Sequence, residues 1–269
     1  MSPLRVLFVC NGHPALEPGE AQWAAHDLLR ALQEQGDTQA MLLACTGASG
    51  RPPRGDVRLQ SVGRSADEAL LWVGAFDPVM LAPRDGSAAL KAFADFLTQF
   101  RPHIVHFHHF RRLGLEALVV VRRILPHARI VATLHDHDLI CANDGRMVTT
   151  TGMPCAGASP DACRSCLKDT SAADLVARDL HVRNLISLID RFVTPSRSLR
   201  ERLLAWGAPC GKVQTIPYGL ADRPAAVASH ARQPRRSFGI FAAISPDSGL
   251  TCALAAARLL AAQDGQAAV

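Results

Sequence analysis

The order of apolar segments is the feature that most restricts the fold of this chain. A continuous apolar run, Leu4 to Cys10, is followed by a turn-rich loop and by a helical pattern over Ala21 to Gln35. Gly36 stops that pattern, and a second apolar run covers Met41 to Cys45. Strands that are apolar on both faces are typical of parallel sheets, which helices cover on both sides. This unit therefore predicts the start of a Rossmann-like fold.

The same alternation continues as far as residue 216, with one interruption at an irregular segment, 135–170. Further strands are expected at 57–62, 103–108, 129–134, 192–194 and 213–216. Helices are expected at 87–100, 113–125, 172–189 and 196–206, and a weak helical pattern covers 65–76. The fold class is thus predicted to be α/β, with a Rossmann-like and mostly parallel sheet.

The last part of the chain predicts a different organisation. Residues 221–237 are polar and rich in Pro, Ala and Arg, which indicates a linker. A strand over 238–244 and a helix over 250–262 follow, and one such pair cannot bury its own faces. We therefore expect a first domain at 1–220, the linker at 221–237, and at 238–269 the incomplete start of a second α/β domain. A tail packed on the first domain is the alternative.

Composition excludes several functions. The net charge is +5, but 26 of the 29 basic residues are arginines spread over the whole chain, and aromatic residues make up only 5%. That pattern argues against nucleic-acid binding and leaves a mildly basic face for anionic substrates or a lipid surface. No apolar stretch approaches the roughly 18 residues of a membrane span. With no secretory signal, we expect a cytoplasmic protein.

Histidines and aspartates follow two of the predicted strands. Because the carboxyl ends of parallel strands share one edge, and ligands bind there, these side chains are candidate site residues. Hydrogen bonding to a sugar and metal binding both remain open for them. They are His103, His106, His108 and His109 on the first strand, and His135, Asp136, His137 and Asp138 after the second.

The first loop lacks the Gly-x-Gly-x-x-Gly spacing of dinucleotide-binding proteins. Gly19 nevertheless precedes a predicted helix, whose free N–H groups favour anions or sugar hydroxyls. The neighbouring Glu20 would weaken the binding of an anion at that position.

Four of the eight cysteines lie within 26 residues, at Cys141, Cys155, Cys163 and Cys166. A Cys-x-x-Cys pair with two further cysteines is typical of a tetrahedral zinc site. Zinc would hold a loop of about 35 residues, which is long for a compact domain. Reduced thiols without metal and a disulfide are the alternatives. The other cysteines, which stand alone in apolar surroundings, are predicted to be buried; they are Cys10, Cys45, Cys210 and Cys252.

Together, several stretches resemble the N-terminal part of glycosyltransferases of the GT-B class, family 4. A branch of this family also carries the pattern Cys141, Asp144-Gly145-x-Met147, Cys155 and Cys163-x-x-Cys166. The resemblance covers residues 4–220. Its stretches are Gly19-Glu20-Ala21-Gln22 with LLRALQEQGD (28–37), RPHIVHFHH (101–109), ATLHDHDLIC (132–141), and DRFVTPSRSLRERLLAWGAP (190–209) with KVQTIPYGL (212–220).

The resemblance implies transfer of a sugar from a nucleotide-diphosphate donor to an acceptor hydroxyl on a glycan or a lipid-linked molecule. His135 would hydrogen-bond the donor sugar, with Asp136 beside it. Gly19 and its neighbour Glu20 would bind substrate, where the loop lets acceptor and donor approach the backbone. His106 and His108 would line the acceptor cleft. No cofactor is required by this chemistry, zinc would be structural, and contact with a membrane surface is compatible with it.

The sequence also departs from the family pattern. Glu20 replaces a glycine, and Gln22 stands at an acidic position. The segment 238–249 lacks the Arg and Lys that hold the donor diphosphate, and the family's glutamate pair would lie beyond Val269. We therefore expect this chain alone to transfer sugar poorly, unless a second polypeptide completes the donor domain. A non-catalytic domain that binds a glycan or a partner is the alternative function.

Overall fold

The computed structural model describes residues 3–47, 57–84, 86–219, 238–240, 244 and 249–264. The chain divides into two compact units, Met1–Ala221 and Asp222–Val269. The predicted linker lies outside the described residues. Residues 241–243 and 245–248 also lie outside them; they belong to the segment in which the sequence lacks the family's diphosphate-binding Arg and Lys.

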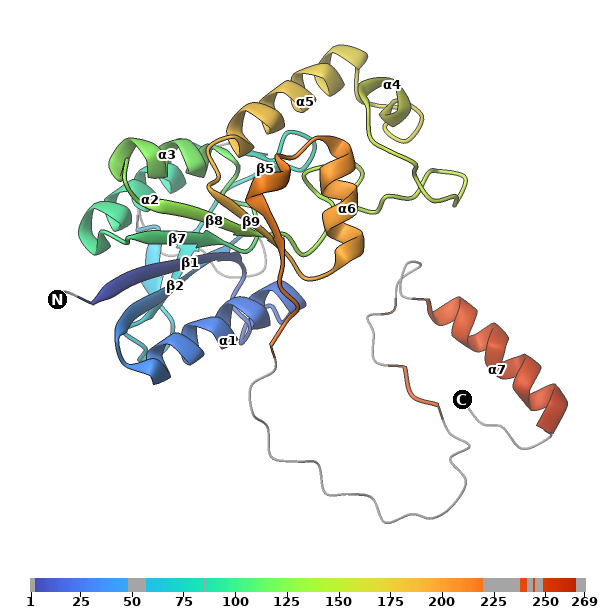
Figure 1. Ribbon diagram of the computed structural model, residues 1–269, viewed down its shortest axis with the longest axis horizontal. Coiled ribbons are helices and arrows are strands. Elements are labelled where there is room, and N and C mark those ends of the chain that lie inside the picture. Colours follow the sequence, from blue (N-terminus) through green and yellow to red (C-terminus); the bar gives the residue numbers. More distant parts are fainter. Residues whose placement is uncertain are drawn as a thin grey trace. The chain divides into compact units, whose positions relative to one another are not determined.

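An eight-stranded sheet forms the centre of the first unit (Figure 1). All neighbouring strands are parallel except β3, which runs antiparallel to β4 at one edge. This confirms the predicted Rossmann-like, mostly parallel α/β fold. In spatial order the strands are β10 (Val213–Thr215), β9 (Arg191–Thr194), β8 (Arg129–Thr133), β7 (Ile104–Phe107), β1 (Leu4–Asn11), β2 (Thr38–Thr46), β4 (Glu68–Trp72) and β3 (Leu59–Ser61).

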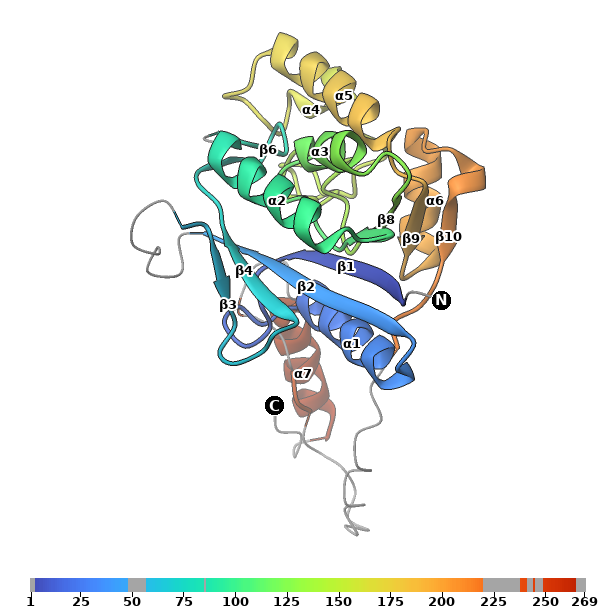
Figure 2. The same ribbon diagram turned by 90° about the vertical axis from the view of Figure 1, so that its left-hand side faces the viewer.

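Helices cover both faces of this sheet, as Figure 2 shows with α1 on one side and α2 and α3 on the other. Alternate residues of β1 enter different cores: Val6 and Phe8 pack with the α1 side, and Leu7 and Val9 with the α2 side. This two-sided burial explains the continuous apolar runs in the sequence. The helices are α1 (Glu20–Gln35), α2 (Gly86–Phe100), α3 (Glu116–Ile124), α5 (Ala172–Ile186) and α6 (Arg197–Trp206).

The weak helix predicted at 65–76 is wrong. Residues Glu68–Trp72 form β4, which pairs in parallel with β2. Leu70 and Leu71 are buried on opposite faces of the sheet, one in each core. Burial on both faces outweighs the helical propensity of Glu, Ala and Leu. A short hairpin of β5 (Phe76–Asp77) and β6 (Ala82–Pro83) follows.

Two further predictions are wrong in the described residues. Cys10 and Cys45 are buried, but Cys210, in a short 3-10 helix, and Cys252, in the helix Leu250–Asp264, are exposed. Residues 238–240 form no strand. The helix predicted at 250–262 is present as α7 (Leu250–Asp264) in the second unit. Among the described residues, no helix has both the length and the apolar character needed to cross a membrane.

Between β8 and α5 the chain runs through a long segment, 134–171, whose only helix is the single turn α4 (Pro160–Cys163). Its first part packs into the core, where Leu139, Ile140 and Met147 are buried. From Val148 to Asp174, by contrast, no residue is buried. Hydrophobic burial therefore contributes little to the conformation of this outer part of the segment.

Candidate functional site

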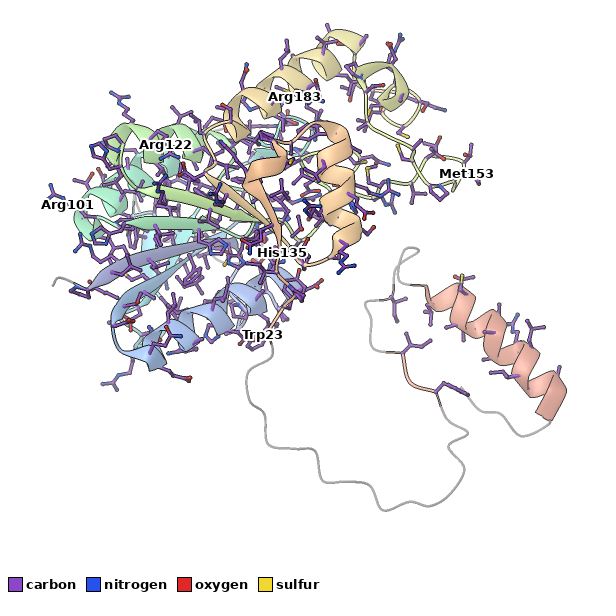
Figure 3. All side chains as sticks on the ribbon, viewed as in Figure 1. Trp23, Arg101, Arg122, His135, Met153 and Arg183 are labelled. Carbon is purple, nitrogen blue, oxygen red and sulfur yellow. The ribbon has the colours of Figure 1, made fainter. Side chains whose placement is uncertain are left out.

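The strands β7, β8 and β10 bring their carboxyl ends to one edge of the sheet, where His135 is labelled in Figure 3. Parallel pairing aligns His106 on β7 with Val131 on β8, so the residues that follow each strand emerge side by side. This edge is where open α/β sheets bind their ligands. It is therefore the candidate functional site.

A string of aromatic side chains crosses this edge. The rings of His106 and His108 lie with their centroids 4.4 Å apart, as expected for alternate residues on one strand face. His108 Nδ1 lies 3.1 Å from His135 Nε2, and His135 Nδ1 lies 2.6 Å from the hydroxyl of Tyr218. His106 Nε2 lies 2.7 Å from the hydroxyl of Thr133. The string thus links three elements of the fold.

The direction of these hydrogen bonds follows from the Glu20 carboxylate, which interacts with the Tyr218 hydroxyl and helps to raise its pKa. A carboxylate can only accept, so the Tyr218 hydroxyl turns its proton toward Glu20. Tyr218 then accepts from His135 Nδ1–H, and His135 Nε2 accepts from His108 Nδ1–H. The remaining nitrogen, His108 Nε2, is an acceptor that is buried without a partner among the described residues. The network therefore assigns one tautomer each to His135 and His108.

Burial keeps these imidazoles neutral. Burial and the charge of His109 lower the pKa of His135 to about 4, although the charge of Asp136 acts in the opposite direction. Burial and the charge of His135 lower the pKa of His106 to about 3. The pKa of His108 also lies well below its usual range, mainly through burial. At neutral pH the string can therefore exchange hydrogen bonds with hydroxyl groups without carrying charge.

Acidification should destabilise the fold through this string. As the pH falls from about 6.5 towards about 4, the unfolded state binds protons on these histidines and the folded state does not. The contribution of these neutral histidines to the free energy of unfolding is therefore fully present above about pH 6.5 and is lost progressively across this window. Urea unfolding at a series of pH values measures the slope. His106→Asn should reduce it, whereas His127→Asn, at an exposed histidine, should not.

A second group lies beside the string. His109 Nε2 is 2.9 Å from Asp136 Oδ2 and 3.4 Å from Asp138 Oδ2. In the described part of the chain these three residues are the one group of three or more metal-ligating side chains whose ligand atoms gather within 4.8 Å. Arg111, however, binds Asp138 through Nε and through Nη2 at 2.7 Å, and it also contacts Asp144. Its guanidinium opposes a cation here, so hydrogen bonding is the better-supported role.

The first loop lies at the same edge of the sheet. Gly12 has φ 94°, in the left-handed region that favours glycine. Gly19, at the N-cap of α1, is extended with φ −170°, so its backbone does not require glycine. A Cβ at Gly19 would instead collide with the side chain of Gln22, which donates to the carbonyl oxygen of Asn11. The absent side chain thus lets Gln22 fold back and brace the loop.

Side chains of β4 and α1 also anchor the first loop. His13 Nε2 lies 2.6 Å from Glu68 Oε2 on β4, and the backbone N–H of Ala15 donates to His13 Nδ1 at 3.2 Å. Arg30 on α1 donates to the other Glu68 oxygen at 2.8 Å. Both His13 and Glu68 are 4% exposed. This buried network connects the conformation of the loop to β4 and α1.

Most of the residues predicted for the site from the sequence meet there, but His103 does not. It precedes β7 and accepts a hydrogen bond from the backbone of Arg5 at the opposite edge of the sheet. Sequence reasoning placed it on the strand, which in fact begins one residue later. His137 contributes no partner to the string, and its Nε2 is buried without one in the described residues.

The sequence reasoning missed Tyr218, Thr133 and Arg111. Tyr218 had a usable signal, since it is the only tyrosine of the chain and closely follows a predicted strand. Thr133 and Arg111 had none, because their roles depend on which side chains they meet across the sheet edge.

The four clustered cysteines lie outside this site, in the segment 134–171. All four are free thiols. Burial raises the pKa of the Cys163 thiol. Within the described residues, however, no three of the sulfurs gather within 4.8 Å. The predicted zinc site stays a prediction at this point.

A Rossmann-like domain with a hydrogen-bonding site at the carboxyl edge of its sheet is thus defined by fold and geometry. The model of the family described as glycosyltransferase family 4 matches residues 21–222 of the 269. The chain belongs to this family, and the resemblance stated from the sequence is confirmed. No curated protein sequence matches the chain.

Similar solved structures are distant in sequence. The apo form of WaaB, a lipopolysaccharide outer core galactosyltransferase, is 9% identical with a TM-score of 0.47, over 87% of this chain and 51% of that one. Anabaena HepE, in complex with UDP and glucose, is 14% identical with a TM-score of 0.43, over 81% and 45%. Sucrose-phosphate synthase from Thermosynechococcus elongatus is 12% identical with a TM-score of 0.43, over 80% and 89%. The chain thus spans about half the length of WaaB and of HepE.

Proposed function

We propose that this chain takes part in transferring a sugar from a nucleotide-diphosphate donor to an acceptor hydroxyl, with its first unit supplying the acceptor side. The observation that carries the proposal is the neutral string from His106 to Tyr218 at the carboxyl edge of the sheet. Sugars are neutral and rich in hydroxyl groups, so a row of uncharged donors and acceptors fits them. Membership of the glycosyltransferase family supports the same assignment.

His135, whose two ring nitrogens contact His108 and Tyr218, would exchange one of these hydrogen bonds for one to the donor sugar and hold its reacting carbon toward the acceptor. Such positioning lowers the barrier by fixing the reactants before the diphosphate leaves. His106 and His108 would orient the acceptor indirectly, because the buried His108 holds His135 by a hydrogen bond. Asp136, which is more exposed than His109, is placed to accept from another hydroxyl.

Glu20 determines which part of the donor can lie at the start of α1. A helix N-terminus ordinarily attracts phosphate groups. The Glu20 carboxylate stands in the first turn of α1 and binds Tyr218. It would repel a diphosphate and accept hydrogen bonds from sugar hydroxyls instead. The sugar, rather than the diphosphate, is therefore the part of the donor that we assign to this side of the site.

The proposal is tested with the purified 269-residue chain, a panel of nucleotide sugars and a panel of glycan and lipid-linked acceptors. Slow acceptor-dependent release of nucleoside diphosphate, with the glycosylated product detected by mass spectrometry, is the expected result for the chain alone. Addition of lysate fractions then shows whether a second polypeptide raises the rate.

A different result would favour the alternative function. If glycans bind, but no nucleotide sugar releases its diphosphate under any of these conditions, the chain is a binding domain. Loss of glycan binding in His106→Ala would then locate that binding at the same edge of the sheet.

A further inference from the structure

We propose that Arg112 is a positioning residue for the transfer reaction. Its guanidinium pairs with Glu17 across the end of β1 and so fixes the first loop relative to the histidines that follow β7. Glu20, which we assign to the sugar, begins α1 directly after this loop. The role of Arg112 in transfer therefore rests on the proposed function, whereas its hold on the loop does not.

The backbone of Arg112 is strained. Its φ is 77°, in the left-handed region, where residues other than glycine are uncommon. The turn around it is anchored in the core by Phe110 and Leu113, which are 4% and 2% exposed. Glycine would fit this conformation without steric strain, yet the position carries a long charged side chain. Such strain persists where the surrounding contacts offset it, so the contacts of the guanidinium indicate what the strained residue does.

The guanidinium reaches across the carboxyl ends of neighbouring strands. β7, β1 and β2 lie side by side in the sheet (Figure 1). Arg112 follows β7, and its Nη1 donates to the carbonyl oxygen of Cys45 on β2 at 2.9 Å. Its Nη2 donates to the carboxylate of Glu17, in the loop that follows β1. One side chain therefore joins the ends of three strands.

Glu17 is held on its other side as well. The hydroxyl of Thr46, the last residue of β2, donates to Glu17 Oε1 at 3.3 Å. The Cys45 carbonyl oxygen that accepts from Arg112 also accepts from the backbone N–H of Gly12, at 2.7 Å. A Cβ at Gly12 would lie 3.1 Å from the Glu17 Cβ, so glycine leaves room for the loop to fold back. The side chains of Arg112 and Glu17 are 24% and 18% exposed, and such shielding from water strengthens their attraction.

The ion pair determines how the two sides of the candidate site lie relative to each other. Arg112 lies four residues after His108, which belongs to the string, and Glu17 lies three residues before Glu20. Because both connecting stretches are short, the contact between Arg112 and Glu17 limits how far Glu20 can move from the histidines. A displacement of about 1 Å among positioned groups can cost about 10²-fold in rate.

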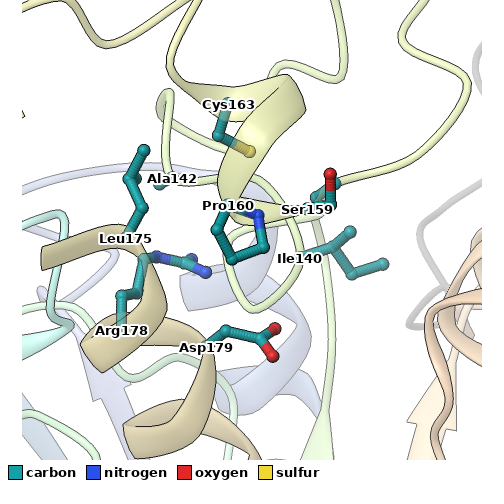
Figure 4. Close-up of a pocket in the computed structure, with 9 residues that line it drawn as sticks. Ile140, Ala142, Ser159, Pro160, Cys163, Leu175, Arg178 and Asp179 are labelled. Atoms are coloured by element: carbon teal, nitrogen blue, oxygen red, sulfur yellow. The ribbon is translucent and has the colours of Figure 1, made fainter. Parts of the chain in front are cut away.

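Arg178 shows how the same chain holds a segment without backbone strain. It lines the pocket drawn in Figure 4 and is 4% exposed. From the helix α5 it donates to the carbonyl oxygens of Val79 and Asp138, each at 2.7 Å. Arg112 instead combines a carbonyl contact with an ion pair, at the edge of the sheet where ligands bind. Its strain and its place both distinguish it from Arg178.

Arg112→Gly in the full chain tests the proposal, because glycine suits the left-handed turn and removes the guanidinium. We expect the melting temperature to stay within about 4 °C of the wild type, since relief of strain offsets part of the lost ion pair. Deuterium uptake by the amides of residues 12–17 should become at least about tenfold faster, and kcat/KM should fall by about 10–10²-fold. Arg112→Lys, which keeps the charge but not the planar fork, should recover part of both losses. The matched control, Arg123→Gln at an exposed arginine of α3, should change neither.

Glu17→Gln breaks the same ion pair without changing the backbone of Arg112, so it should show the same changes even if Arg112→Gly folds poorly. Two results would overturn the proposal. Loop amides that exchange as slowly in both variants as in the wild type would show that the ion pair does not hold the loop. Faster exchange with an unchanged kcat/KM would show that the position of the loop does not affect transfer. If the wild type itself transfers no sugar, the proposed function fails, and hydrogen exchange still decides whether Arg112 holds the loop.

Discussion

Replacing His135 by alanine should lower the rate of sugar transfer by about 10²–10³-fold, the typical cost of removing one preorganised hydrogen-bonding group from an active site. The imidazole is held between His108 and Tyr218 at 3.1 and 2.6 Å, so its orientation is fixed before the substrate binds. Alanine removes both the contact to the sugar and the link between the other two side chains. Steady-state release of nucleoside diphosphate by the purified chain measures the effect.

His103→Ala is the matched control, because His103 precedes β7 at the amino ends of the strands, and its side chain accepts a hydrogen bond from the backbone N–H of Arg5. Its rate should stay within about twofold of the wild type. Tyr218→Phe should give an intermediate loss, about tenfold, since it removes one hydrogen bond to His135 and leaves the ring. A rate unaffected by His135→Ala would remove this edge of the sheet from the transfer reaction.

The sheet could be predicted where the strands are buried on both faces. Leu4 to Cys10 and Met41 to Cys45 are such strands, and their continuous apolar runs leave little choice of structure. The strand β4 was misread because Glu, Ala and Leu also form helices, and only the pairing with β2 decides the outcome. The strand β3, at the sheet edge, has only three residues and gives a correspondingly weak pattern.

The candidate site could be predicted as a location but not as a network. Histidines after two parallel strands indicate the correct edge, and His106, His108 and His135 do meet there. Tyr218 joins them from the segment after β10, 83 residues from His135 in the sequence, and β10 is the last strand at one end of the sheet. Glu20 was expected to weaken anion binding and to lie at the substrate, and its interaction with Tyr218 was not foreseen. Long-range contacts of this kind depend on strand order, which the sequence pattern does not specify.

Replacing Glu68 by glutamine should destabilise the fold by about 2–3 kcal/mol, through the network that anchors the first loop. Glu68 is 4% exposed and is shared by His13, Arg30 and His26, at 2.6, 2.8 and 3.6 Å. Breaking a fully buried ion pair costs about 3–5 kcal/mol. The lower end applies here because Arg30 is 51% exposed and can return to water. Urea unfolding at neutral pH measures the change, and Glu34→Gln, at an exposed glutamate of the same helix as Arg30, should change stability by less than about 0.5 kcal/mol.

The pH dependence of this stability change distinguishes the effect of the Glu68 charge from the effect of its packing. Burial alone would raise the pKa of Glu68, but the hydrogen bond with His13 and the charges of Arg30 and His26 lower it overall. A carboxyl whose folded-state pKa is depressed stabilises the fold fully above its unfolded value of about 4.3, and this stabilisation is lost as the pH falls through the folded value. The difference between wild type and Glu68→Gln should therefore shrink on acidification below about pH 4.3. A difference that stays constant with pH would mean that Glu68 acts through its shape, and that the first loop is held by packing rather than by charge.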